Sequence, residues 1–169
     1  MGRAFDVAGV LLLLGLGCAA GVAGAIESDP LPVPKGDTRQ GAVAAYNDGV
    51  KLMTEKRYAV AQQKFEEALA ADERLAEAHN NLAFSLRMQS VANRERALTH
   101  YNRALELKPQ LAEAYMYRGV LFTQMGDLSR ARADHAKLLA LDRQLAAKLE
   151  RIIAGAGRDD ADGLAPQYD

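Results

Sequence analysis

A cassette of small and bulky side chains recurs along the chain at a nearly constant interval, and this self-similarity limits the possible folds more than any other feature. Each copy has a small residue, a ring-bearing residue four positions later and an alanine or leucine three positions after that. The copies are Ala61, Phe65 and Ala68; Ala97, Tyr101 and Ala104; and Ala131, His135 and Leu138. The interval is 36 residues and then 34 residues. A period of this length indicates stacked copies of one structural unit.

The residues around each copy predict what that unit is. They are rich in Ala, Leu, Glu, Lys and Arg and place apolar residues at helical spacing, so each copy is expected to form two antiparallel helices. One small residue stands in the first helix of each pair, and the set is Gly49, Ala83 and Gly119. A bulky side chain there would push the helices apart at a cost of about 1–3 kcal/mol. One hairpin cannot bury its own apolar face, so the array is expected to fold as a unit, with Phe65 and Tyr101 between neighbouring hairpins.

The period and its residues resemble the tetratricopeptide repeat, whose pattern runs W-x2-L-G-x2-Y, then A-x3-F, then P. The second copy matches it with Leu82, Ala83, Ala97, Tyr101 and Pro109. The resemblance implies an all-α fold, a right-handed α-solenoid of three helix-turn-helix repeats with a C-terminal capping helix. The expected segments are repeats at residues 42–75, 76–111 and 112–145, a capping helix at residues 146–154 and a disordered tail at residues 155–169. The expected helices within the repeats cover residues 42–55, 58–71, 75–89, 94–107, 111–125 and 128–141.

Residues 1–25 have the pattern of a secretory signal peptide. Arg3 precedes a stretch from Val7 to Ile26 that has no charged residue, and the small residues Ala23, Gly24 and Ala25 form an A-x-A cleavage site before Ile26. The sequence therefore predicts that the protein is exported.

Two other interpretations of the same stretch stay open. The segment from Leu14 to Cys18 resembles a bacterial lipoprotein signal, which would end before Cys18 and leave that residue as a possible lipidation site. The apolar stretch is also long enough to stay in a membrane as an anchor, although its glycines make a poor helix. Residues 26–41 follow as a linker in which prolines at every second position favour extended chain.

No pattern in the chain predicts catalysis or a bound cofactor. Cys18 is the only cysteine, and no H-E-x-x-H or G-x-S-x-G motif or phosphate-binding glycine loop occurs. His79 and His135 occupy positions where the repeat has aromatic residues, so a packing role is expected, and His100 is expected to be exposed. A net charge of -1 gives no basis for binding nucleic acid. We therefore expect that the protein is not an enzyme and that it binds neither a metal ion nor a cofactor.

The resemblance implies that the first helices of the repeats line a concave groove, and the expected partner is a protein or peptide. Aromatic, methionine and amide side chains at helical spacing are suited to gripping a peptide. The candidate groove residues are Tyr46, Val50, Met53, Asn80, Asn81, Phe84, Arg87, Met88, Met116, Tyr117 and Val120. Some relatives grip chaperone C-terminal carboxylates with a lysine–asparagine–arginine clamp. Only Asn81 agrees with that clamp, so this ligand is disfavoured.

These features predict a non-enzymatic scaffold of the bacterial cell envelope, periplasmic or anchored as a lipoprotein. Membrane contact is expected only through an N-terminal lipid anchor. A second hypothesis is an outer-membrane lipoprotein pilot or assembly factor for a secretion or pilus machine. A third is a self-associating structural accessory to an envelope enzyme.

Overall fold

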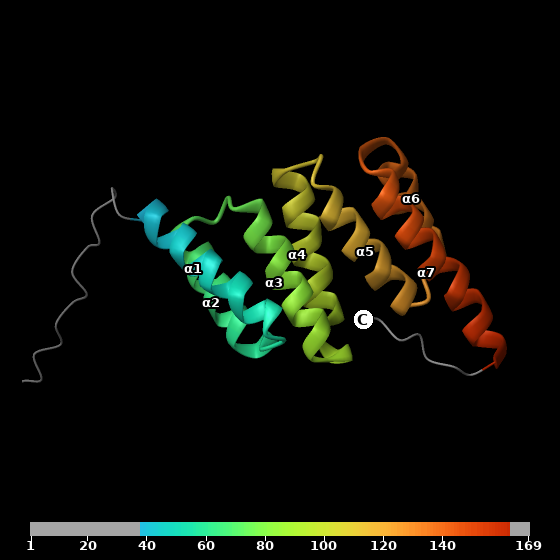
Figure 1. Cartoon of the computed structure of the whole chain (residues 1–169), viewed down its shortest axis with the longest axis horizontal. Helices are drawn as coiled ribbons and strands as arrows, with labels where there is room; N and C mark the ends of the chain where they lie inside the picture. The colour runs from blue at the N-terminus through green and yellow to red at the C-terminus, as the bar shows by residue number, and fades with distance from the viewer. Residues whose placement is uncertain (1–37, 163–169) are drawn as a thin grey trace, which may run out of the picture. The chain divides into compact units, whose positions relative to one another are not determined.

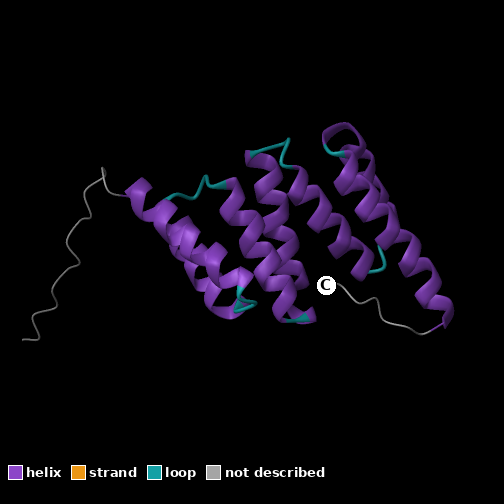
Figure 2. Ribbon diagram, in the orientation of Figure 1, coloured by secondary structure: helices purple, strands orange, loops and turns teal. Residues whose placement is uncertain are grey.

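The computed structural model describes residues 38–162, and throughout this stretch the chain forms helices joined by short turns (Figures 1 and 2). The elements are α1 (Thr38–Thr54), α2 (Tyr58–Ala71), α3 (Ala76–Gln89), the short 3-10 helix η1 (Val91–Asn93), α4 (Arg94–Leu107), α5 (Ala112–Gln124), α6 (Leu128–Leu141) and α7 (Arg143–Asp162). The signal peptide at residues 1–25, the lipidation site at Cys18 and residues 26–37 of the linker lie outside the described residues.

Successive helices pair as three hairpins, α1 with α2, α3 with α4, and α5 with α6, and each hairpin packs on the next. The last helix, α7, packs on both α5 and α6. The architecture is thus an all-α helical repeat, as predicted. The predicted bounds of the second helices, 58–71, 94–107 and 128–141, are those of α2, α4 and α6.

The predicted limits of the terminal helices need correction. Helix α1 begins at Thr38, inside the predicted linker, and α7 extends from Arg143 to Asp162. The helix therefore includes residues 155–162, which were predicted to belong to the tail. The Asp142 carboxylate caps the start of α7 by accepting bonds from the Gln144 and Leu145 amides at 2.8 and 3.0 Å. Glycines at 155 and 157 each cost about 1 kcal/mol in a helix, but the first helix-breaking proline comes only at position 166.

The small residues of the repeat are necessary for close helix packing. A Cβ added at Gly49 would lie 2.6 Å from the ring of Phe65, which is fully buried. At Gly119 the added Cβ would overlap the Leu149 side chain of α7. Gly119 therefore makes room for the last helix rather than for its own hairpin partner, and this fit holds α7 against α5.

A buried ion pair joins the third hairpin. Arg118 on α5 donates two hydrogen bonds to the Asp134 carboxylate on α6, at 3.0 and 2.6 Å, and a third to the Asn102 side chain on α4 at 2.7 Å. Burial raises the pKa of Asp134 above its ordinary value, although Arg118 acts in the opposite direction. The net free energy from such a pair is small, because the cost of removing the charges from water offsets their attraction.

Candidate functional site

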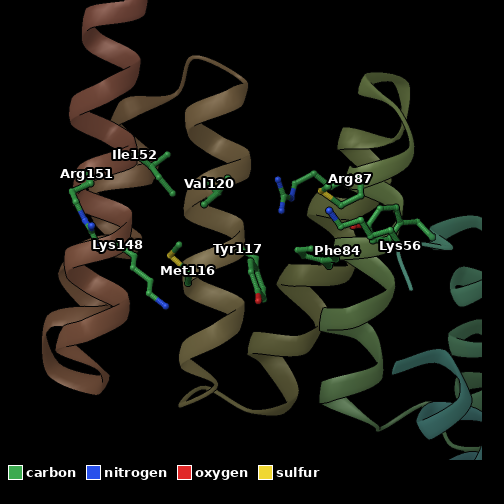
Figure 3. Close-up of a pocket in the computed structure, with 11 residues that line it drawn as sticks. Lys56, Phe84, Arg87, Met116, Tyr117, Val120, Lys148, Arg151 and Ile152 are labelled. Atoms are coloured by element: carbon green, nitrogen blue, oxygen red, sulfur yellow. The ribbon is translucent and has the colours of Figure 1, made fainter. Parts of the chain in front are cut away.

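A groove of about 610 Å³ lies over α5, between α3 and α7 (Figure 3). Its volume is within the range of about 300–1,000 Å³ that is usual for ligand sites. The side chains around it come from the α1–α2 turn and from four helices: Lys56, Tyr58, Phe84, Arg87, Met88, Met116, Tyr117, Val120, Lys148, Arg151 and Ile152. Six of the candidate residues from the sequence are therefore brought together here, namely Phe84, Arg87, Met88, Met116, Tyr117 and Val120.

Phe84 is the centre of an aromatic cluster at one end of the groove. Its ring meets Tyr117 edge to face at a centroid distance of 5.0 Å and Tyr58 at 6.0 Å. The guanidinium of Arg87 lies 5.1 Å from the Phe84 centroid. Edge-to-face pairs of this kind contribute about 0.5–1.5 kcal/mol each beyond the area they bury. The cluster is therefore a preformed apolar surface.

Five other candidate residues lie outside the groove. Tyr46 packs against Phe65 at 5.9 Å, and its hydroxyl accepts a bond from the Asn81 amide at 3.3 Å. Asn80 is buried and donates to the Asn81 side chain at 3.1 Å. Val50 and Met53 pack against the core. Tyr58, which was not among the candidates, therefore stands beside Phe84 where Tyr46 does not.

Sequence reasoning missed the contribution of α7 to the groove. Lys148 and Arg151 are exposed and Ile152 packs on the third hairpin, yet all three also line the groove. Lys148 and Ile152 reach from α7 toward α5, and Arg87 reaches toward α5 from the opposite side (Figure 3). The three α7 residues are spaced i, i+3 and i+4, so they share one helix face. This spacing is the sequence signal that could have identified a shared groove-lining face on α7.

The charged residues of the groove all have the same sign. Lys56, Arg87, Lys148 and Arg151 are among its lining residues, and neither aspartate nor glutamate is. Among the ion pairs formed within residues 38–162, none includes any of these four cations. Like charges around a concave apolar surface strengthen the local potential. The groove is therefore positive.

Lys56 has an unusual backbone conformation. Its φ is 58°, and it follows α1 at a position where Lys56 and Arg57 amides bond back to the Met53 and Leu52 carbonyls at 3.0 and 2.9 Å. The same pattern after α5 places Gly126 at φ 78°. Glycine is the usual residue there, because a side chain in the left-handed region costs about 1–2 kcal/mol.

Two histidines form a hydrogen-bonded pair away from the groove. His79 and His100 face each other with Nδ1 atoms 3.0 Å apart, and His79 Nε2 lies 3.1 Å from the Glu73 carbonyl oxygen. That oxygen can only accept, so neutral His79 donates through Nε2 and accepts the Nδ1 proton of His100. His100 is half-buried, so the prediction of exposure is wrong. Burial lowers the pKa of both imidazoles below its ordinary value.

Among residues 38–162, no three side chains of His, Cys, Asp or Glu come together where they could hold a metal ion. None of the helices in this part of the chain combines the length and apolarity needed to cross a bilayer.

Stacked helical hairpins around a preformed groove define the class of this protein, a helical-repeat scaffold. A family profile described as "TPR repeat" matches residues 94–126. Residues 94–126 thus match one tetratricopeptide repeat, and residues 38–162 have the fold of tetratricopeptide-repeat domains. No curated protein sequence matches it.

Several solved structures share the fold. The second tetratricopeptide domain of Spaghetti (RPAP3), bound to an HSP90 peptide, is 26% identical with a TM-score of 0.58, covering 64% of this chain and 97% of that one. The TPR2B domain of yeast Sti1, in complex with an Hsp70 peptide, is 18% identical with a TM-score of 0.63, covering 71% and 98%. The Yersinia enterocolitica chaperone SycD, with a peptide of the translocator YopD, is 11% identical with a TM-score of 0.60, covering 69% and 92%.

Proposed function

We propose that this chain is an exported bacterial scaffold that holds a segment of a partner protein in the groove over α5 and catalyses no reaction. The observation that carries the proposal is the preformed apolar groove centred on Phe84 and Tyr117. The peptide complexes of the RPAP3, Sti1 and SycD domains support it, because proteins of the same fold hold peptides.

The proposed location is the bacterial cell envelope, either in the periplasm or at a membrane through a lipid. The support is the basic start at Arg3, the uncharged stretch that follows it and the A-x-A site before Ile26. A lipoprotein pilot or assembly factor for a secretion or pilus machine is a second candidate, which the position of Cys18 after a leucine- and glycine-rich run favours.

The mass of the mature protein tests the location. A mature chain that starts at Ile26 without lipid supports a periplasmic protein, and one that starts at an acylated Cys18 supports the lipoprotein. A native protein that is cytosolic and retains Met1 would contradict both.

Crosslinking from the groove tests the scaffold function. Met88 lies exposed at the groove, so it can be replaced by a photo-crosslinking amino acid in the full-length chain in native cells. We expect light-dependent adducts with a discrete partner from this position, and none from the matched exposed position Lys137 on α6. Adducts from Lys137 alone would place the binding surface elsewhere and contradict the proposal.

The partner identified in this way allows a quantitative test. Binding energy usually concentrates in a few central aromatic residues, so Phe84→Ala is expected to weaken binding by at least about 2 kcal/mol, roughly thirtyfold. Lys64→Ala on α2 is the control, because Lys64 lies outside the groove. Thermal unfolding of both variants is recorded alongside titration. A folded Phe84→Ala protein that binds like the wild type would refute the assignment of the groove.

A further inference from the structure

We propose that the groove selects an acidic segment that carries apolar side chains, and that α7 supplies half of the positive charges that recognise it. This inference rests on the proposed function, because it assigns the chemistry of the partner at the same groove. An acidic segment is the occupant whose charge is complementary to the cations of the groove.

The distribution of charge is the first argument. The four cations surround an apolar floor of Phe84, Met116 and other side chains, with no acidic residue among the lining side chains. A segment with carboxylates flanking an apolar residue matches both parts of this surface. A basic segment would meet four like charges, and like-charge contacts in a concave site are strongly unfavourable.

The way α7 is held is the second argument. Lys148 and Arg151 are exposed side chains, one turn apart, on a helix that is fixed by fully buried Leu149 packed against Gly119. Their backbone positions are therefore set by the core rather than by a mobile loop. Together with Ile152 they place two charges and one apolar group at the groove, and Lys148 and Ile152 point toward α5 (Figure 3). These positions differ from those of the carboxylate clamp known in relatives.

The backbone at Lys56 is the third argument. The chain places a lysine in a left-handed conformation, whereas Gly126 occupies the matching turn after α5. Strain of this kind persists where the surroundings enforce it and is concentrated at functional sites. The side chain kept at that cost is one of the four cations of the groove.

A protein segment fits this surface better than a lipid bilayer. The apolar residues lie at the floor of a recess of about 610 Å³, with the cations around them. A flat anionic membrane would reach the cations but not the floor, whereas an extended or helical segment can insert its side chains.

Fluorescence anisotropy with the full-length chain tests the proposal. The probes are three labelled synthetic peptides: an acidic peptide with Leu and Phe at its centre, the same peptide with Lys for every acidic residue, and the acidic peptide with Gly for Leu and Phe. We expect the first to bind at least about tenfold more tightly than either of the others. Its affinity should fall between about 50 mM and about 300 mM sodium chloride, because salt screens exposed charges.

Matched double variants test the role of α7. Lys148→Ala with Arg151→Ala should weaken binding of the acidic peptide at least about tenfold without changing the thermal midpoint, because both side chains are exposed. Arg132→Ala with Lys137→Ala removes two exposed cations from α6, outside the groove, and should leave affinity unchanged. Equal loss in both variants would show nonspecific attraction and overturn the proposal.

Other outcomes separate this inference from the proposed function. If the lysine peptide binds as tightly as the acidic one, or the α7 variant binds normally, the acidic specificity is wrong. Crosslinking from Met88 would still support the scaffold function in that case. If phosphatidylglycerol vesicles bind the wild type but not the α7 variant, while the acidic peptide does not bind, the cations serve a membrane surface and the proposal is overturned.

Discussion

Replacing Gly119 by alanine tests how α7 is held in place. The added methyl group would overlap the Leu149 side chain, with its Cδ1 and Cγ atoms at 3.0 and 3.3 Å from the new Cβ. Leu149 is fully buried, so it cannot swing into solvent to relieve the overlap. The substitution therefore requires Leu149 to repack within the core or α7 to shift away from α5.

Two opposing effects decide how much Gly119→Ala changes the free energy of unfolding. Alanine favours a helix over glycine by about 0.5–1 kcal/mol. Overpacking a well-filled core costs about 1–3 kcal/mol. Overpacking is the larger effect where the clash is with a buried side chain, so Gly119→Ala should lower the free energy of unfolding by about 1–2 kcal/mol. Such a loss lowers the thermal midpoint by several degrees in a domain of this size.

Gly155→Ala is the matched control for this prediction. It makes the same chemical change in α7, where no atom apart from the neighbouring residues and the helix's own backbone lies within 4 Å of the added Cβ. Here only helix propensity acts, and the variant should be more stable by about 0.5–1 kcal/mol. The two variants are thus expected to shift in opposite directions.

Urea unfolding followed by circular dichroism gives the free energy of unfolding of both variants. Titration with the acidic peptide shows whether the groove still binds it. Because α7 carries Lys148, Arg151 and Ile152, its displacement should also weaken peptide binding. A Gly119→Ala protein that is stabilised as much as Gly155→Ala would refute the packing argument.

Two further predictions concern the histidine pair and Lys56. Since burial lowers the pKa of His79 and His100, their contribution to stability is fully present above the ordinary histidine pKa and is lost as the pH falls through the lowered values. Glu73 and Arg103 act on His79, and Arg96 and Glu66 on His100. The urea midpoint of the wild type should therefore decrease as the pH is lowered from about 7.5 to about 5.5. The decrease should be smaller in the double variant His79→Phe, His100→Phe. An equal decrease in both proteins would show that the histidine pair is not responsible. Lys56→Gly should relieve left-handed strain and raise the free energy of unfolding by about 0.5–1 kcal/mol. The same substitution should weaken binding of the acidic peptide. Unchanged binding in a more stable variant would show that Lys56 does not recognise the peptide.

The sequence by itself was sufficient to predict the helices and their pairing. The signals are local, because small residues such as Gly49 and Ala97 and large ones such as Phe65 and Tyr101 recur at a fixed interval. Each hairpin contacts mainly its neighbours, so a pattern within about 34 residues determines its structure. The residues of α3 and α5 that line the groove, including Phe84 and Tyr117, followed from helical spacing on the first helix of each repeat.

Only the tertiary structure decided which side chains share the groove. The orientation of α7 against the third hairpin depends on contacts between residues distant in sequence, such as Gly119 with Leu149. Contacts between helices also bring Lys148 and Arg151 to the groove, pair His79 with His100, and place Tyr58 rather than Tyr46 beside Phe84. Helical periodicity shows which residues share one face of a helix. The packing of whole helices against each other decides which faces meet.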